Sequence, residues 1–166
     1  MDERRSAKGL NGAGQMEPRW FVAMMRNAQW KKAATELTGM GIAHYIPASY
    51  RTLLFLHTDK ATALSLVNAG RIHARFLIDH GTRTLLVVPQ KQMEDFMRVL
   101  EEPDAVCSPD VSFAKGDRVR VIRGSLKGVE GEIVEAPDGA MLAVRVSTLL
   151  CAKVRIPRTD VVPAGQ

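Results

Sequence analysis

Apolar positions in the first hundred residues alternate between the pattern of buried strands and that of helices. The continuous apolar run at residues 20–25 has the length of a buried strand. Trp30, Ala33, Ala34 and Leu37 then stand at i, i+3, i+4 and i+7, which predicts a helix with one apolar stripe. The same patterns predict strands at residues 42–46, 53–57, 74–78 and 84–88, and a short helix at 58–67.

A last helix is predicted after Pro89. Its stripe at i, i+3, i+4 and i+7 consists of Met93, Phe96, Met97 and Leu100. Glu94 and Asp95 lie beside this stripe, and we expect both on the solvated side of the helix because charge normally occupies that side. The order of strands and helices predicts an α+β domain, with an antiparallel or mixed sheet backed by helices.

The C-terminal third has a different pattern, in which short strands are separated by glycine-containing turns. Strands are predicted at residues 118–123, 133–134, 141–146, 152–156 and 161–162, with a hairpin turn at 137–139. Five short strands in so few residues are too few for a sandwich of two sheets, but they can close into a small barrel. The segment is therefore predicted to be a small β-barrel.

Composition marks the boundaries between these parts. Residues 1–16 are rich in glycine and charge and are expected to form a flexible tail. Two prolines and several acidic residues interrupt the pattern near residue 105. The predicted division is a tail at 1–16, an α+β domain at 17–104, a linker at 105–112 and a barrel at 113–166.

Charge and candidate chemistry narrow the function further. The 166 residues carry a net charge of +5, and the basic excess lies mostly in the predicted C-terminal barrel at residues 113–166. This excess permits contact with nucleic acid without requiring it. No nucleophile motif, phosphate loop or metal-ligand spacing occurs, so we expect neither an enzyme nor a metal or other cofactor. No membrane span or secretory signal is evident, and a cytoplasmic monomer is the expectation.

Two stretches carry a family resemblance. Residues 115–134 closely resemble the KOW motif, in which one strand leads through Gly-x-x-Lys-Gly-x-x-Gly into another. The motif positions are Gly124, Lys127, Gly128 and Gly131. Residues 20–26, 31–32 and 41–47 resemble the N-terminal domain of NusG, and residues 87–100 are similar to its UpxY branch. That branch acts in antitermination of polysaccharide operons.

The resemblance implies a fold, a partner and a site. The fold would be a NusG-type α/β sandwich followed by an SH3-like barrel. The first domain would bind the clamp helices of bacterial RNA polymerase through Met24, Leu53 and Phe55, although members of the family often have aromatic residues at two of these positions. The barrel would recruit another partner, with Rho or a ribosomal protein as candidates. The long basic loop of the family is reduced here to residues 48–52.

An alternative from a different class is an RNA- or ribosome-binding KOW protein without polymerase activity. Its candidate phosphate contacts are Arg118, Arg120, Arg123, Lys127, Lys153 and Arg155. The same alternation of arginine and valine also fits an ordinary half-buried strand with a solvated outer face. Both activities are compatible, and contact with nascent RNA or with the non-template DNA strand would fit either one.

Overall fold

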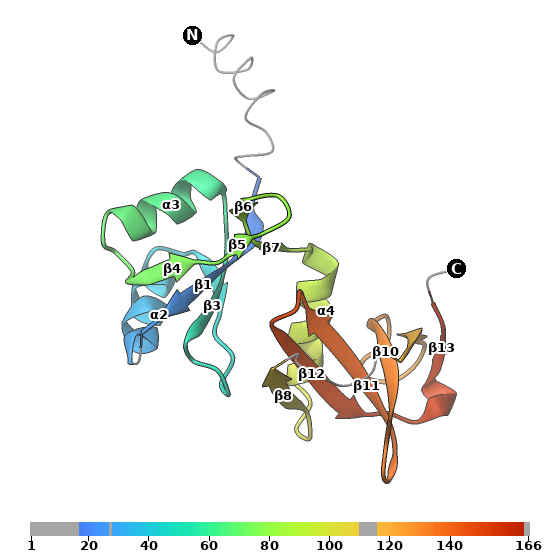
Figure 1. The fold of residues 1–166 in the computed structure, drawn as a ribbon. Coiled ribbons are helices and arrows are strands. Elements are labelled where there is room, and N and C mark those ends of the chain that lie inside the picture. Colours follow the sequence, from blue (N-terminus) through green and yellow to red (C-terminus); the bar gives the residue numbers. More distant parts are fainter. Residues whose placement is uncertain (1–16, 27, 110–115, 165–166) are drawn as a thin grey trace. The chain divides into compact units, whose positions relative to one another are not determined.

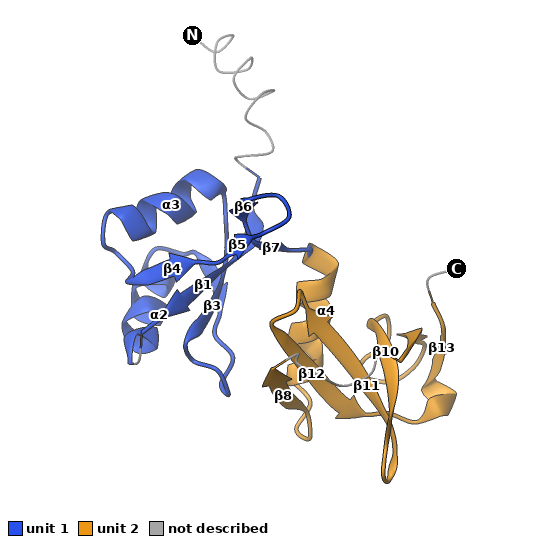
Figure 2. Cartoon of the chain, in the orientation of Figure 1, with its two compact units in different colours: residues 1–89 blue, residues 90–166 orange. Residues whose placement is uncertain are grey.

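The computed structural model describes residues 17–26, 28–109 and 116–164. Its contacts divide the chain into two compact units, residues 1–89 and 90–166, which we call unit 1 and unit 2 (Figure 2). Unit 1 combines a sheet with helices, and unit 2 contains a six-stranded antiparallel sheet. The predicted α+β class is therefore confirmed. The expected tail at residues 1–16 lies outside the described residues.

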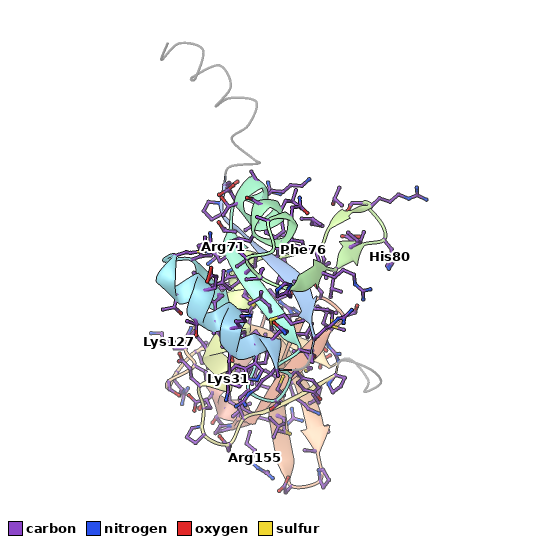
Figure 3. The ribbon with its side chains drawn as sticks, turned by 90° about the vertical axis from the view of Figure 1, so that its left-hand side faces the viewer. Lys31, Arg71, Phe76, His80, Lys127 and Arg155 are labelled. Atoms are coloured by element: carbon purple, nitrogen blue, oxygen red, sulfur yellow. The ribbon has the colours of Figure 1, made fainter. Side chains whose placement is uncertain are left out.

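Unit 1 follows the predicted order of strands and helices, except that the strands predicted at residues 74–78 and 84–88 are each divided into two short strands (Figure 1). Its elements are β1 (Arg19–Met25), α2 (Gln29–Gly39), β2 (Ala43–Tyr45), β3 (Leu53–Thr58), α3 (Lys60–Asn68), β4 (Ala74–Phe76), β5 (Ile78–Asp79), β6 (Thr84–Leu85) and β7 (Val87–Val88). The main sheet has the order β2-β3-β1-β4, β7 also pairs with β1, and every pair is antiparallel. The β5–β6 hairpin is separate, and His80 lies at its outer tip (Figure 3).

Side chains along β1 and β3 alternate between the two faces of the sheet, as the period of a strand requires. Phe21 and Ala23 on β1, with Leu54 and Leu56 on β3, form a core with α2 and α3. The helices supply Ala33, Leu37, Ala63 and Leu66 to this core. Strand alternation therefore directs the intervening residues toward the opposite face.

The side chain of Asp59 caps the start of α3. The Asp59 carboxylate accepts hydrogen bonds from the backbone N–H of Thr62 (2.9 Å) and from its hydroxyl (2.7 Å). The Thr62 hydroxyl bond, followed by the Thr62 N–H bond, lowers the pKa of Asp59 below its usual value of 3.8, because both stabilise the ionised form. The carboxylate satisfies one of the otherwise unpaired N–H groups at the helix start.

Unit 2 combines one helix with a six-stranded antiparallel sheet (Figure 1). Its elements are α4 (Gln90–Leu100), β8 (Val106–Pro109), β9 (Asp117–Val121), β10 (Glu130–Ala136), β11 (Gly139–Val146), β12 (Leu150–Arg155), the 3-10 turn η1 (Arg158–Asp160) and β13 (Val161–Pro163). The strand order is β13-β9-β10-β11-β12-β8. The five predicted strands are present, and β8 adds a sixth by pairing with β12.

The boundary between the two units falls at a different residue from the predicted boundary between the two domains. Residues 90–104 were expected in the first domain and residues 105–112 in a linker. In the structure α4 packs against β11 and β12, and residues 106–109 are strand β8. Both segments therefore lie in unit 2, while residues 110–112 lie outside the described residues. An apolar helix stripe predicts that one face is buried, but it does not identify the surface that buries it.

None of the helices within residues 17–26, 28–109 and 116–164 is long and apolar enough to cross a bilayer.

Candidate protein- and nucleic-acid-binding surfaces

The three expected polymerase-binding residues lie on the sheet face opposite α2 and α3. Met24 on β1 is the register partner of Leu53 on β3, and Phe55 stands two positions further along β3. The structure therefore brings the three side chains to one face, as strand alternation predicts. Their exposure differs, because Met24 is 41% exposed whereas Leu53 is buried and Phe55 is 0% exposed. Of the three, Met24 offers the accessible contact.

The glycines of the KOW-like loop have backbone roles. Gly124 and Gly128 have positive φ angles of 87° and 94°, which glycine adopts without the strain that a side chain brings. A Cβ atom on Gly131 would stand 2.4 Å from the carbonyl oxygen of Ala143 on the neighbouring strand β11. These three residues allow the chain to turn and to approach β11 closely. Lys127 is the motif residue that is not a glycine, and its side chain is exposed to a ligand.

Helix α4 makes hydrogen bonds to the same loop and to the turn between β11 and β12. Lys91 Nζ donates to the carbonyl oxygen of Gly128 (2.7 Å), and an Arg98 guanidinium nitrogen donates to that of Ser125 (3.0 Å). The Ser147 amide donates to Gln92 Oε1 (2.9 Å). Backbone groups of both turns are thus satisfied by side chains of the helix rather than by water or a ligand.

Asp95 is the most buried of these helix residues. It is 2% exposed, and its carboxylate accepts hydrogen bonds from Lys91 Nζ (2.8 and 2.9 Å) and from the Glu130 amide (3.1 Å). The expectation that Asp95 lies on a solvated face is therefore wrong, although the neighbouring Glu94 is exposed. A buried carboxylate is tolerated here because an ammonium group and a backbone N–H both contact it.

The six candidate phosphate contacts lie on two strands and in one loop of unit 2. Arg118 and Arg120 lie on β9, whereas Lys153 and Arg155 lie on β12, with β10 and β11 between them in the sheet. Arg123 and Lys127 lie in the loop between β9 and β10. Two strands of the sheet therefore separate the arginines of β9 from the cations of β12, and contact of these six side chains with a phosphate backbone stays a prediction.

Several of these arginines also have acidic partners within unit 2. The guanidinium of Arg118 lies 3.8 Å from the Glu130 carboxylate, and that of Arg123 lies 3.7 Å from Asp160. Arg155 pairs with Asp138, and their hydrogen bond is the main cause of the lowered pKa of Asp138. Such pairing reduces the positive charge that unit 2 offers to phosphate groups.

Reactive thiols and metal ligands offer no further site in the described parts of the chain. Burial raises the pKa of the Cys107 thiol to about 11, so the nucleophilic thiolate is scarce at neutral pH. No group of three His, Cys, Asp or Glu side chains among the described residues is arranged to hold a metal ion.

Unit 1 contains an open groove that the sequence analysis missed. It has a volume of about 810 Å³ and lies where β1 ends, α2 begins and the chain enters β4. Arg26, His73 and Arg75 line it together with Met25 and Ile72. These residues are scattered along the sequence and form no motif, so only the excess of basic residues in this region could have pointed to them.

Comparison with known families identifies a KOW motif at residues 115–146, which confirms that part of the resemblance. The KOW motif suggests a factor that binds nucleic acid or protein. The match does not extend to unit 1, whose α/β arrangement fits the expected NusG N-terminal domain without being assigned to it. No curated protein matches the chain.

Proposed function

We propose that this chain is a non-enzymatic transcription elongation and antitermination factor of the NusG type, similar to the UpxY branch. The observation that supports the proposal is the KOW motif in unit 2, preceded by an α/β unit that fits the expected NusG N-terminal domain. In this function unit 1 binds the clamp helices of bacterial RNA polymerase, and unit 2 binds a second partner. Polysaccharide operons are the target class that the UpxY resemblance suggests.

Met24 is the residue of unit 1 that best tests polymerase binding. An exposed apolar side chain gains free energy when a partner removes it from water, and a charge at the same place opposes burial. Met24→Glu is preferable to Phe55→Glu, because a charge at the fully buried Phe55 would disturb the fold itself. Met40 provides a matched control, since it has the same side chain and is 40% exposed at the end of α2.

The experiment measures binding of the full chain to purified bacterial core RNA polymerase. We expect Met24→Glu to weaken binding at least about tenfold, as loss of roughly 1.4 kcal/mol implies, and Met40→Glu to leave it within about twofold. Absence of binding by the unaltered chain would contradict the proposed function. Equal binding by the unaltered chain and Met24→Glu would contradict the site alone.

The partner of unit 2 is a separate part of the proposal, with Rho, a ribosomal protein, nascent RNA and non-template DNA as candidates. The alternative function, RNA or ribosome binding without polymerase, requires that unit 2 contact phosphates. Affinity for RNA would then fall steeply between low and physiological salt and would fall further in Lys127→Glu. Affinity that is independent of salt would exclude the alternative, and the arginine–carboxylate pairs of unit 2 favour that result.

A further inference from the structure

The groove in unit 1 combines apolar walls with cationic side chains. Exposed Met24 and half-buried Val67 supply accessible apolar surface above the buried Met25 and Ile72, and Arg26, His73 and Arg75 are exposed around it. Its volume of about 810 Å³ lies in the range of protein pockets that hold a ligand or a short peptide segment. It opens at the end of the sheet, where Met24, the register partner of Arg75, also lines it.

The basic side chains of the groove lack partners of their own. Over the described residues, neither arginine nor His73 forms an ion pair or a side-chain hydrogen bond, and no Asp or Glu lines the groove. Arg71, close in sequence, is by contrast paired with Glu36 of α2 at 2.7 Å and lies beside that helix (Figure 3). Unit 1 as a whole is basic, because residues 17–89 contain nine Lys and Arg against four Asp and Glu.

The electrostatic field at the start of helix α2 is positive, like the charge of the groove side chains. Gln29, the first residue of α2, lines the groove, and the first turn of this helix contains no acidic residue. The partial positive charge of a helix N-terminus therefore adds to that of the arginines. The groove is complementary to a negatively charged ligand that also carries apolar groups.

The lining residues distinguish between a protein and a nucleic acid as that ligand. Among the described residues that line the groove, His73 has the one aromatic ring on which a base could stack, whereas single strands gain much of their affinity from several rings that stack on successive bases. Apolar side chains of a peptide would instead pack against Met24 and Val67 while its carboxylates approach the arginines. We propose that this groove binds an acidic amphipathic segment of a partner protein. The groove shares Met24 with the polymerase-binding face of the proposed function and extends beyond that face to Arg26 and His73.

The test uses the full chain labelled with ¹⁵N and follows its amide signals by NMR. The probes are a synthetic peptide of repeated Glu-Leu-Leu-Glu units, the same peptide with Gln in place of Glu, and a single-stranded oligonucleotide of mixed sequence. We expect the acidic peptide to shift amides at the end of β1, the start of α2 and residues 72–75. Arg26→Glu and Arg75→Glu should each weaken its binding about tenfold, which corresponds to roughly 1.4 kcal/mol.

Arg19→Glu is the matched control, because Arg19 is an exposed arginine at the other end of the same strand. It should change peptide affinity by no more than about twofold. The proposal is overturned if the Gln peptide binds equally well, if the acidic peptide shifts other amides or none, or if only the oligonucleotide shifts these amides. Polymerase binding is not measured in this experiment, so its result is independent of the proposed function.

Discussion

The two units differ in their charge and in how that charge is paired. Residues 17–89 have a net charge of +5, whereas residues 90–166, with eleven basic and twelve acidic side chains, have a net charge of −1. The arginines of the unit 1 groove lack acidic partners in the described chain, while those of unit 2 contact Glu130, Asp138 and Asp160. Unit 2, which contains the KOW motif, is thus the unit whose basic side chains mostly pair with acidic side chains of the same unit.

This difference changes where an electrostatic partner is expected. From the sequence, the basic excess was expected at the C-terminal end because the predicted domain boundary lies near residue 104. Residues 90–112 contain two basic and six acidic side chains, and the described part of that segment lies in unit 2. Long-range attraction of an acidic partner therefore favours unit 1, although the matched family motif lies in the other unit.

The largest expected effect tests whether the KOW glycines are structural. Gly131→Ala places a Cβ atom 2.4 Å from a backbone oxygen, which cannot move without shifting β11. We expect unit 2 to lose about 3 kcal/mol of unfolding free energy, as in severe overpacking. Gly39→Ala in unit 1 is the control, because no atom lies within 4 Å of its Cβ position and alanine favours a helix.

The two units can be followed separately in that experiment. Both tryptophans, Trp20 and Trp30, lie in unit 1, so their fluorescence reports the unfolding of that unit. Hydrogen exchange of amides in β10 and β11 reports unit 2. Gly131→Ala should accelerate exchange in unit 2 and leave the fluorescence transition unchanged. Unchanged exchange would show that the close approach of β10 and β11 relaxes without cost.

A smaller effect tests whether α4 belongs to unit 2. Asp95→Ala removes the acceptor of the Glu130 amide and leaves that donor buried, which costs about 2 kcal/mol. Glu94→Ala, at the next position of the same helix, removes an exposed carboxylate and should cost far less. We expect Asp95→Ala to accelerate hydrogen exchange at Glu130 and its neighbours. A shift of the tryptophan transition of unit 1 instead would place α4 with that unit, as the sequence division expected.

Helix α4 also shows how far the sequence could predict the fold. Its existence and the burial of Met93 and Phe96 follow from spacing, and both are confirmed. The actual buried face includes Asp95 and Val99, whereas Met97 and Leu100 are only half-buried. Periodicity describes the helix alone, and the amide that pairs with Asp95 lies 35 residues away on β10. Contacts at that separation depend on how distant segments fold together, which a local pattern does not contain.

The candidate sites were predictable to different degrees for the same reason. The KOW glycines form a contiguous pattern, and the family match confirms it. Met24 and Leu53 were expected at one site from the family resemblance, but the difference in their exposure depends on what surrounds each residue in the folded chain. The groove joins the end of β1 to residues near position 73, so its arginines become neighbours only after the sheet has formed.

The smallest expected effect concerns the charge balance of unit 1, where the Asp59 cap stabilises α3. Asp59→Ala should lower the unfolding free energy of unit 1 by about 1 kcal/mol at neutral pH, measured by urea unfolding with tryptophan fluorescence. Because the pKa of Asp59 is lowered from 3.8, this stabilisation is fully present above pH 3.8 and is lost as the pH falls through the lower folded value. Asp59→Asn keeps an acceptor for the Thr62 amide and should retain most of the cap without this pH dependence. If the wild-type and Asn chains lost stability equally on acidification, the ionised carboxylate would not be the stabilising group.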